Sequence, residues 1–121
     1  MRGPGPGPAL VVVRSGPATE RGWLGLRMAL AWGLAGADVT VWLCGEGAGW
    51  ALPLDARSWL GGDPGGDLQG LVDDAGATVM VDAGDLAALG VPPSGCRAGV
   101  AVAEPAEFPR RYGGSSVVLT V

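Results

Sequence analysis

Short apolar runs alternate along the chain with longer segments of helical periodicity. The apolar runs predict strands at residues 10–13, 38–43, 78–81, 99–103 and 116–121. The longer segments predict helices at residues 19–35, 67–76, 84–89 and 104–112. Strands that alternate with helices pair in parallel and carry the helices on both faces. The pattern therefore predicts an α/β fold with three layers, α/β/α, around a mainly parallel five-stranded sheet.

Capping and turn residues set the predicted ends of several elements. Thr19 is a good N-cap for the first helix, and Gly36 fits a left-handed stop after it. Asp67 fits the N-cap of the second helix. Residues 52–60 are ambiguous, with a short helix around 56–59 as one interpretation.

The first predicted helix is apolar on nearly every side. The face spaced for packing on a sheet carries Trp23, Leu26, Leu30 and Leu34. The remaining surface is also apolar, with Leu24, Met28, Ala31, Trp32 and Ala35. In a small domain a flanking helix should have a side that faces water, and large exposed apolar patches mark interfaces. We therefore expect another subunit to cover this side, in a homo-oligomer (a trimer or hexamer) or a hetero-oligomer with similar chains.

Length and composition limit the range of functions. At 121 residues, with 48% apolar and 17% charged residues, the chain predicts one globular domain over residues 9–121. Residues 1–8 alternate Gly and Pro and predict a disordered tail. The sequence contains no His, which excludes a Ser-His-Asp or Cys-His catalytic pair and removes imidazole as a metal ligand. We expect no metal site and no cofactor.

The charge pattern argues against two classes of partner. The net charge is −4, and the basic residues form no cluster beyond Arg110 and Arg111, so we expect no nucleic-acid binding. No apolar run is long enough to cross a bilayer, and we expect no membrane partner. Two Cys without a secretion signal are typical of a reducing compartment, and we expect a cytoplasmic protein.

Three loops should meet beyond the carboxyl ends of the strands, where parallel sheets place their functional groups. They begin at Ser15-Gly16-Pro17, at Cys44-Gly45-Glu46-Gly47 and at Asp82-Ala83-Gly84-Asp85. None has the spacing of a nucleotide-binding loop. The candidate binding residues at this edge are Gly16, Pro17, Glu46, Gly47, Asp82 and Asp85, and the candidate catalytic residue is Cys44.

Cys44 and the aspartates each have two interpretations. A Cys44 thiolate at this edge can accept a sulfane sulfur, but a cysteine at a strand end also serves as a small buried hydrophobe, and the nearby Glu46 disfavours the thiolate. Asp82 and Asp85 can act as paired carboxylates. Alternatively, Asp82 accepts backbone N–H groups as the cap of a short helix.

Several short motifs along the chain resemble the DsrE/DsrF/TusBCD sulfur-relay family. They are Gly16-Pro17 after the first strand, residues 26–31 in the first helix, 36–41 at the second strand, Glu46-Gly47, residues 68–81 leading to the third strand, 86–91 after it, and the closing strand at 117–121. The resemblance implies an intracellular sulfur-relay role carried by a cysteine at the end of the third strand. An ungapped alignment places Asp82 at that position, and a carboxylate cannot hold a persulfide.

The resemblance and the aspartate together leave three hypotheses for the function. The first is a non-catalytic, oligomeric or partner subunit of the DsrE-like kind. The second is a sulfur carrier that uses Cys44 in place of the missing cysteine. The third is a small-molecule binding module at the glycine-rich edge of the sheet.

Overall fold

The computed structural model describes residues 7–53 and 64–121. Within them the strands are β1 (Ala9–Val13), β2 (Val39–Leu43), β3 (Thr78–Asp82), β4 (Val100–Ala103) and β5 (Val117–Thr120). The α-helices are α1 (Glu20–Leu34), α2 (Pro64–Asp73), α3 (Ala83–Ala88) and α4 (Glu107–Gly113), with 3-10 helices η1 (Gly45–Ala51) and η2 (Pro93–Gly95). Residues 1–6 of the predicted tail (1–8) and the possible helix at 56–59 lie outside the described residues. The carbonyl of Pro8 accepts backbone hydrogen bonds from Ser116 and Val117.

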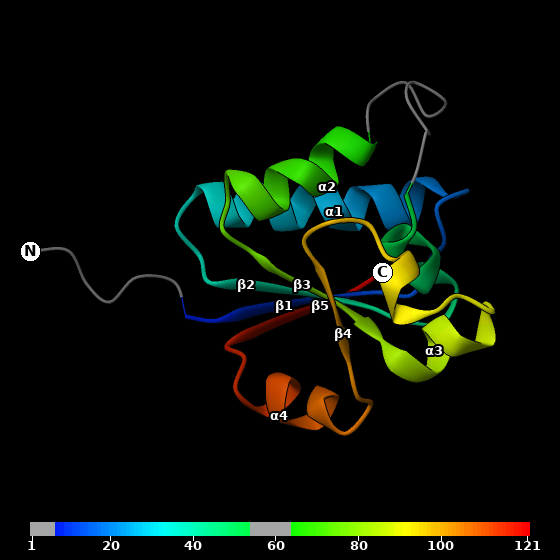
Figure 1. The fold of residues 1–121 in the computed structure, drawn as a ribbon. Helices are drawn as coiled ribbons and strands as arrows, with labels where there is room; N and C mark the ends of the chain where they lie inside the picture. The colour runs from blue at the N-terminus through cyan, green and yellow to red at the C-terminus, as the bar shows by residue number, and fades with distance from the viewer. Residues whose placement is uncertain (1–6, 54–63) are drawn as a thin grey trace, which may run out of the picture.

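The five strands form one sheet in the order β4-β3-β2-β1-β5, and every pairing is parallel. Helices α1 and α2 lie side by side on one face, α4 lies on the other, and α3 lies near the carboxyl ends of the strands (Figure 1). The prediction of a three-layer α/β/α fold around a parallel five-stranded sheet is confirmed. Strands β1 and β2 are buried along their whole length, as their continuous apolar runs predict.

The two faces of the sheet carry separate apolar clusters. The larger cluster lies under α1 and α2 and includes Val11, Val41 and Trp50. The smaller one lies under α4, where the rings of Trp42 and Phe108 meet edge to face at 5.4 Å. Because α4 has only seven residues, it leaves part of its face of the sheet uncovered.

The ends of α1 form as the sequence predicts, but the start of α2 does not. Thr19 caps α1 by accepting the N–H of Gly22 at 3.2 Å, and Gly36 has a positive φ of 101° after it. Helix α2 begins at Pro64, so the prediction of Asp67 as its N-cap is wrong. Proline favours the first helical position, and the Asp67 carboxylate instead accepts a 2.6 Å hydrogen bond from the indole of Trp23.

Helix α1 packs on the sheet through small residues. Gly22, Gly25 and Ala29 are buried beside Leu26, and a Cβ at Gly25 would collide with the side chain of Val121. Leu34, predicted to face the sheet, is 60% exposed. Helix α1 therefore lies close to β1, β2 and Val121, and larger side chains remain on its outer side.

Candidate functional site

The loops predicted to meet do so at the carboxyl edge of the sheet. Register pairs Val13 with Leu43, and Leu43 with Val81. The next residue on each strand is therefore level with its neighbours, which places Cys44 between Arg14 and Asp82. Neighbouring strands lie about 4.8 Å apart. The Cys44 thiol is thus displaced by one strand from the position at which the family resemblance expects a cysteine.

Asp82 and Asp85 are both engaged in hydrogen bonds that shape this edge. Asp82 is the N-cap of α3, and its Oδ1 accepts the N–H of Asp85 at 3.0 Å. The carboxylate of Asp85 in turn accepts the N–H of Gly45 at 2.8 Å. This chain of bonds ties the start of α3 to the loop after β2. The interpretation of Asp82 as a helix cap agrees with the structure, in which its carboxylate accepts the N–H of Asp85.

The surroundings of Cys44 favour the neutral thiol. Burial raises the pKa of Cys44 above its ordinary value, and Asp85 raises it further. Arg14 acts in the opposite direction, and Asp82 adds a smaller increase. Cys44 is partly buried against the cluster under α4, and it forms no disulfide. A raised pKa makes a thiol a weaker nucleophile at neutral pH because the thiolate is the reactive form.

The glycines of this edge allow segments of the chain to pack closely. A Cβ at Gly47 would collide with the carbonyl of Val13, and one at Gly16 would lie 3.3 Å from the carbonyl of Glu46. Pro17 lies against Gly49, where an added Cβ would be 3.0 Å from its ring. These contacts account for Gly16, Pro17 and Gly47 without a bound ligand.

An open hollow of about 670 Å³ lies beside these loops, between the ends of β5, β1 and β2. Of the predicted binding residues, Glu46 lines it. Arg14 and Arg21 also line it and were missed by the sequence reasoning, although Arg14 directly follows a predicted strand. Among the described residues, no group of three or more His, Cys, Asp or Glu could hold a metal ion.

A second feature, on the outer side of α1, is apolar and exposed. Leu24 is 60% exposed and Met28 is 44% exposed. Residues three or four apart share one side of a helix, so Leu24, Met28, Ala35 and Trp32 form one continuous strip. We call these four residues the α1 strip.

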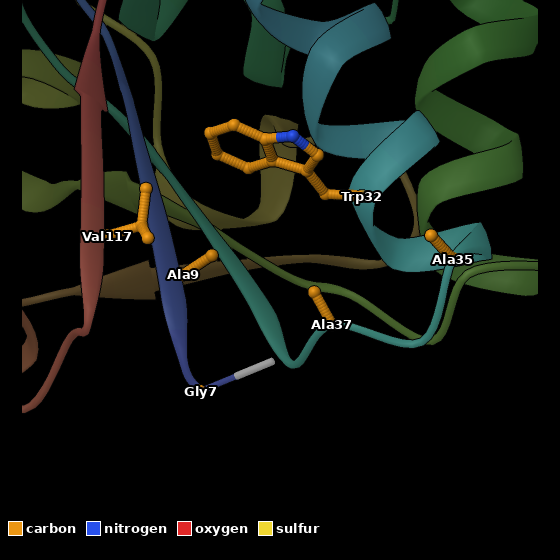
Figure 2. Close-up of a pocket in the computed structure, with 6 residues that line it drawn as sticks. All are labelled: Gly7, Ala9, Trp32, Ala35, Ala37 and Val117. Carbon is orange, nitrogen blue, oxygen red and sulfur yellow. The ribbon is translucent and has the colours of Figure 1, made fainter. Parts of the chain in front are cut away.

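The α1 strip borders an apolar hollow of about 330 Å³ at the amino ends of the strands. Trp32 of α1, Ala9 of β1 and Val117 of the edge strand β5 line it (Figure 2). Val117 is 49% exposed, so the strip and the hollow form a single apolar surface that extends from the helix onto the sheet edge.

The order of the sheet and the arrangement of the helices around it are shared with a solved structure. A solved structure that shows this is that of the YchN protein of E. coli, which matches with a TM-score of 0.81 over 96% of this chain and 99% of that one. The two sequences are 16% identical, so the likeness shows the fold alone. No protein-family model matches the sequence, and no curated protein matches it. Among the described residues, no helix is sufficiently long and apolar to span a membrane.

Proposed function

We propose that this protein is a non-catalytic DsrE-like subunit related to intracellular sulfur-relay proteins, and that it works by assembling with copies of itself or with similar DsrE-like chains. The observation that carries the proposal is Asp82. It stands at the end of β3, where the resemblance expects a thiol, and its carboxylate caps α3.

The charge of the carboxyl edge supports a non-catalytic role. Asp82 and Asp85 both raise the pKa of Cys44, and the chain has no His or Lys that could act as an activating base. Within the described part of the chain, Arg14 is the one charged group that lowers that pKa. The edge thus disfavours the thiolate on which sulfur transfer depends.

The α1 strip supports assembly. Burying one Leu or Met side chain contributes roughly 1.5–3 kcal/mol, and the strip offers two of these side chains beside a Trp. The adjoining hollow gives the surface a concave part that a protruding side chain of another subunit can fill. Shape of this kind is typical of the centre of a protein interface.

The mass of the protein in solution, measured by light scattering across a concentration series, tests assembly. We expect an oligomer in the wild type and dissociation in Leu24→Glu, because the variant would bury an unpaired charge. Leu89→Glu is the matched control, since Leu89 is 47% exposed and lies away from the strip, directly after α3. A wild-type protein that stays monomeric at every concentration would reject self-assembly.

A sulfur carrier based on Cys44 is the second candidate, because Cys44 is level with Asp82 at the carboxyl edge. After incubation with a sulfane-sulfur donor, a carrier gains whole sulfur atoms that a reductant removes. Intact mass and peptide mapping would locate the gain, and Cys44→Ser would abolish it, whereas Cys96→Ser would not. A wild type that gains no sulfur while both thiols remain titratable after unfolding would leave only the assembly subunit.

A further inference from the structure

A polar hollow of about 330 Å³ lies at the amino ends of β1 and β2, on the side of α4. It is at the opposite end of the strands from Cys44 and shares no residue with the loops of the carboxyl edge. Its polar lining comes from Asp38 and Thr40 at the start of β2 and from Arg110, Arg111 and Ser115 at the end of α4.

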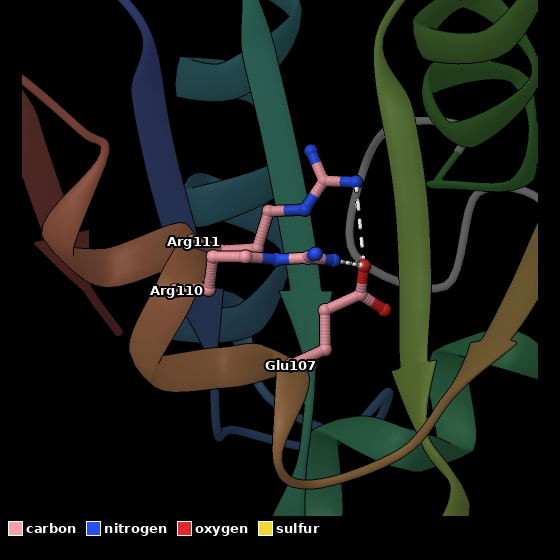
Figure 3. A network of polar contacts seen from close by, with 3 residues as sticks. All are labelled: Glu107, Arg110 and Arg111. Carbon is pink, nitrogen blue, oxygen red and sulfur yellow. Dashed lines mark hydrogen bonds and ion pairs between the residues drawn. The ribbon is translucent and has the colours of Figure 1, made fainter.

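The two arginines of the hollow share one carboxylate. The guanidinium of Arg110 donates to Oε1 of Glu107 at 2.6 Å, and that of Arg111 lies 3.6 Å from the same oxygen. Both side chains extend from α4 toward Glu107 (Figure 3). Two positive charges thus face one negative charge, and Nε of Arg111 is buried without a hydrogen-bond partner among the described residues. Glu107, Arg110 and Arg111 together therefore carry a net charge of +1.

Asp38 adds a negative charge to the lining of the same hollow. Asp38 is exposed at the start of β2, and no ion pair joins it to Arg110 or Arg111. Residues of opposite charge therefore line one hollow without an ion pair between them. The hydroxyl of Ser115 donates to the carbonyl of Arg111 at 2.7 Å, which leaves its oxygen lone pairs available to an incoming N–H donor.

We propose that this hollow binds a small zwitterion of the amino-acid class. Its carboxylate accepts hydrogen bonds from the guanidinium groups of Arg110 and Arg111. Its ammonium group binds Asp38 and the oxygen of Ser115. The volume is at the lower end of the range of ligand pockets, about 300–1,000 Å³, and suits a molecule of that size. This inference is independent of the assembly role proposed above.

Titration of the full-length protein, followed by NMR chemical shifts, tests the proposal with three probes. Alanine carries both charges, acetate carries only the carboxylate and methylammonium only the cation. We expect alanine to bind at least about tenfold more tightly than either single-charge probe, because it adds a charge-assisted hydrogen bond to Asp38 or to the arginines. The shifts should centre on Asp38, Arg111 and Ser115.

Matched variants separate the two ends of the ligand. Asp38→Asn should remove the advantage of alanine over acetate, whereas Arg110→Gln should weaken both probes. The controls are Asp74→Asn and Arg27→Gln, which make the same changes at exposed residues on the other face of the sheet and should leave binding unchanged. Thermal unfolding of each variant confirms that the fold is retained.

Three results would overturn the proposal. They are the absence of saturable alanine binding, equal affinity for alanine and acetate in the wild type, and an Asp38→Asn variant that is folded and still prefers alanine. The first would mean that the hollow holds only water, the second that it binds a simple anion, and the third that Asp38 does not bind the ammonium group.

Discussion

Replacing Asp82 distinguishes a helix cap from a functional carboxylate. In Asp82→Ala the N–H of Asp85, bonded at 3.0 Å in the wild type, loses its acceptor. Loss of an N-cap costs about 1 kcal/mol, within a range of roughly 0.5–2 kcal/mol. Asn caps helices about as well as Asp, so Asp82→Asn should retain nearly all of the stability.

The loss of unfolding free energy in Asp82→Ala should also include a contribution from the loop after β2. The start of α3 carries Asp85, whose carboxylate holds the N–H of Gly45 at 2.8 Å. If fraying of α3 also weakens that bond, a further contribution of about 0.5–1.5 kcal/mol is at risk. We therefore expect Asp82→Ala to lower the free energy of unfolding by about 1–2 kcal/mol. For a chain of this length that is a fall in melting temperature of about 3–8 °C.

Urea unfolding, followed by tryptophan fluorescence at one fixed protomer concentration, measures the difference. The concentration must be fixed because association would itself stabilise the folded chain. If Asp82→Asn loses as much stability as Asp82→Ala, the negative charge matters and the cap explanation fails. If neither variant loses stability, the bond to Asp85 contributes nothing and Asp82 is available for another role.

Three further predictions concern the same edge. Gly47→Ala should destabilise the protein by about 1–3 kcal/mol in urea unfolding because its Cβ collides with the carbonyl of Val13. The control Gly113→Ala, whose Cβ meets nothing within 4 Å, should be close to neutral, and equal effects of the two variants would contradict the packing role of Gly47. Trp50→Phe should cost about 1–3 kcal/mol in the same assay, since it removes the 2.8 Å hydrogen bond from the buried indole to the carbonyl of Ser15, and an unchanged midpoint would count against that bond. Iodoacetamide should alkylate Cys44 in the folded protein only at higher pH than in the unfolded chain, because a raised pKa keeps the thiol protonated. The alkylation rate of Cys44, followed by peptide mapping, should depend on pH with a midpoint that is lower in Asp85→Asn and higher in Arg14→Gln, and shifts of the opposite sign would refute the electrostatic explanation.

The sequence allows the fold to be predicted because local signals agree with the topology. Continuous apolar runs define β1 and β2, and Thr19 and Gly36 delimit α1 by capping chemistry that needs no tertiary contact. The start of α2 escapes prediction because Asp67 is a good N-cap by type, but a long-range bond to Trp23 uses its carboxylate.

Side-chain environments at the sheet edges are predicted less well. Trp50 lies beside glycine-rich loops in the sequence, but it is buried because η1 packs against β2 and its indole donates to the carbonyl of Ser15. The polar hollow on the side of α4 depends on Asp38 and Arg111, which are distant in sequence and share no motif. Only the arrangement of β2 and α4 brings them to one place. Helical periodicity indicated the apolar surface of α1, but it placed Leu34 on the wrong side.

The two ends of the sheet differ in whether their charged side chains already have hydrogen-bond or ion-pair partners. At the carboxyl edge, Asp82 and Asp85 accept hydrogen bonds from backbone N–H groups, so a ligand that bound these two carboxylates would have to displace bonds that hold α3 in position. At the amino edge, Asp38 and the two arginines line one hollow without an ion pair between the opposite charges. A ligand that carries both charges can contact these residues without displacing a hydrogen bond of the Asp38 carboxylate. The physical argument for ligand binding is therefore stronger at the edge that lies away from the position where family resemblance expects chemistry.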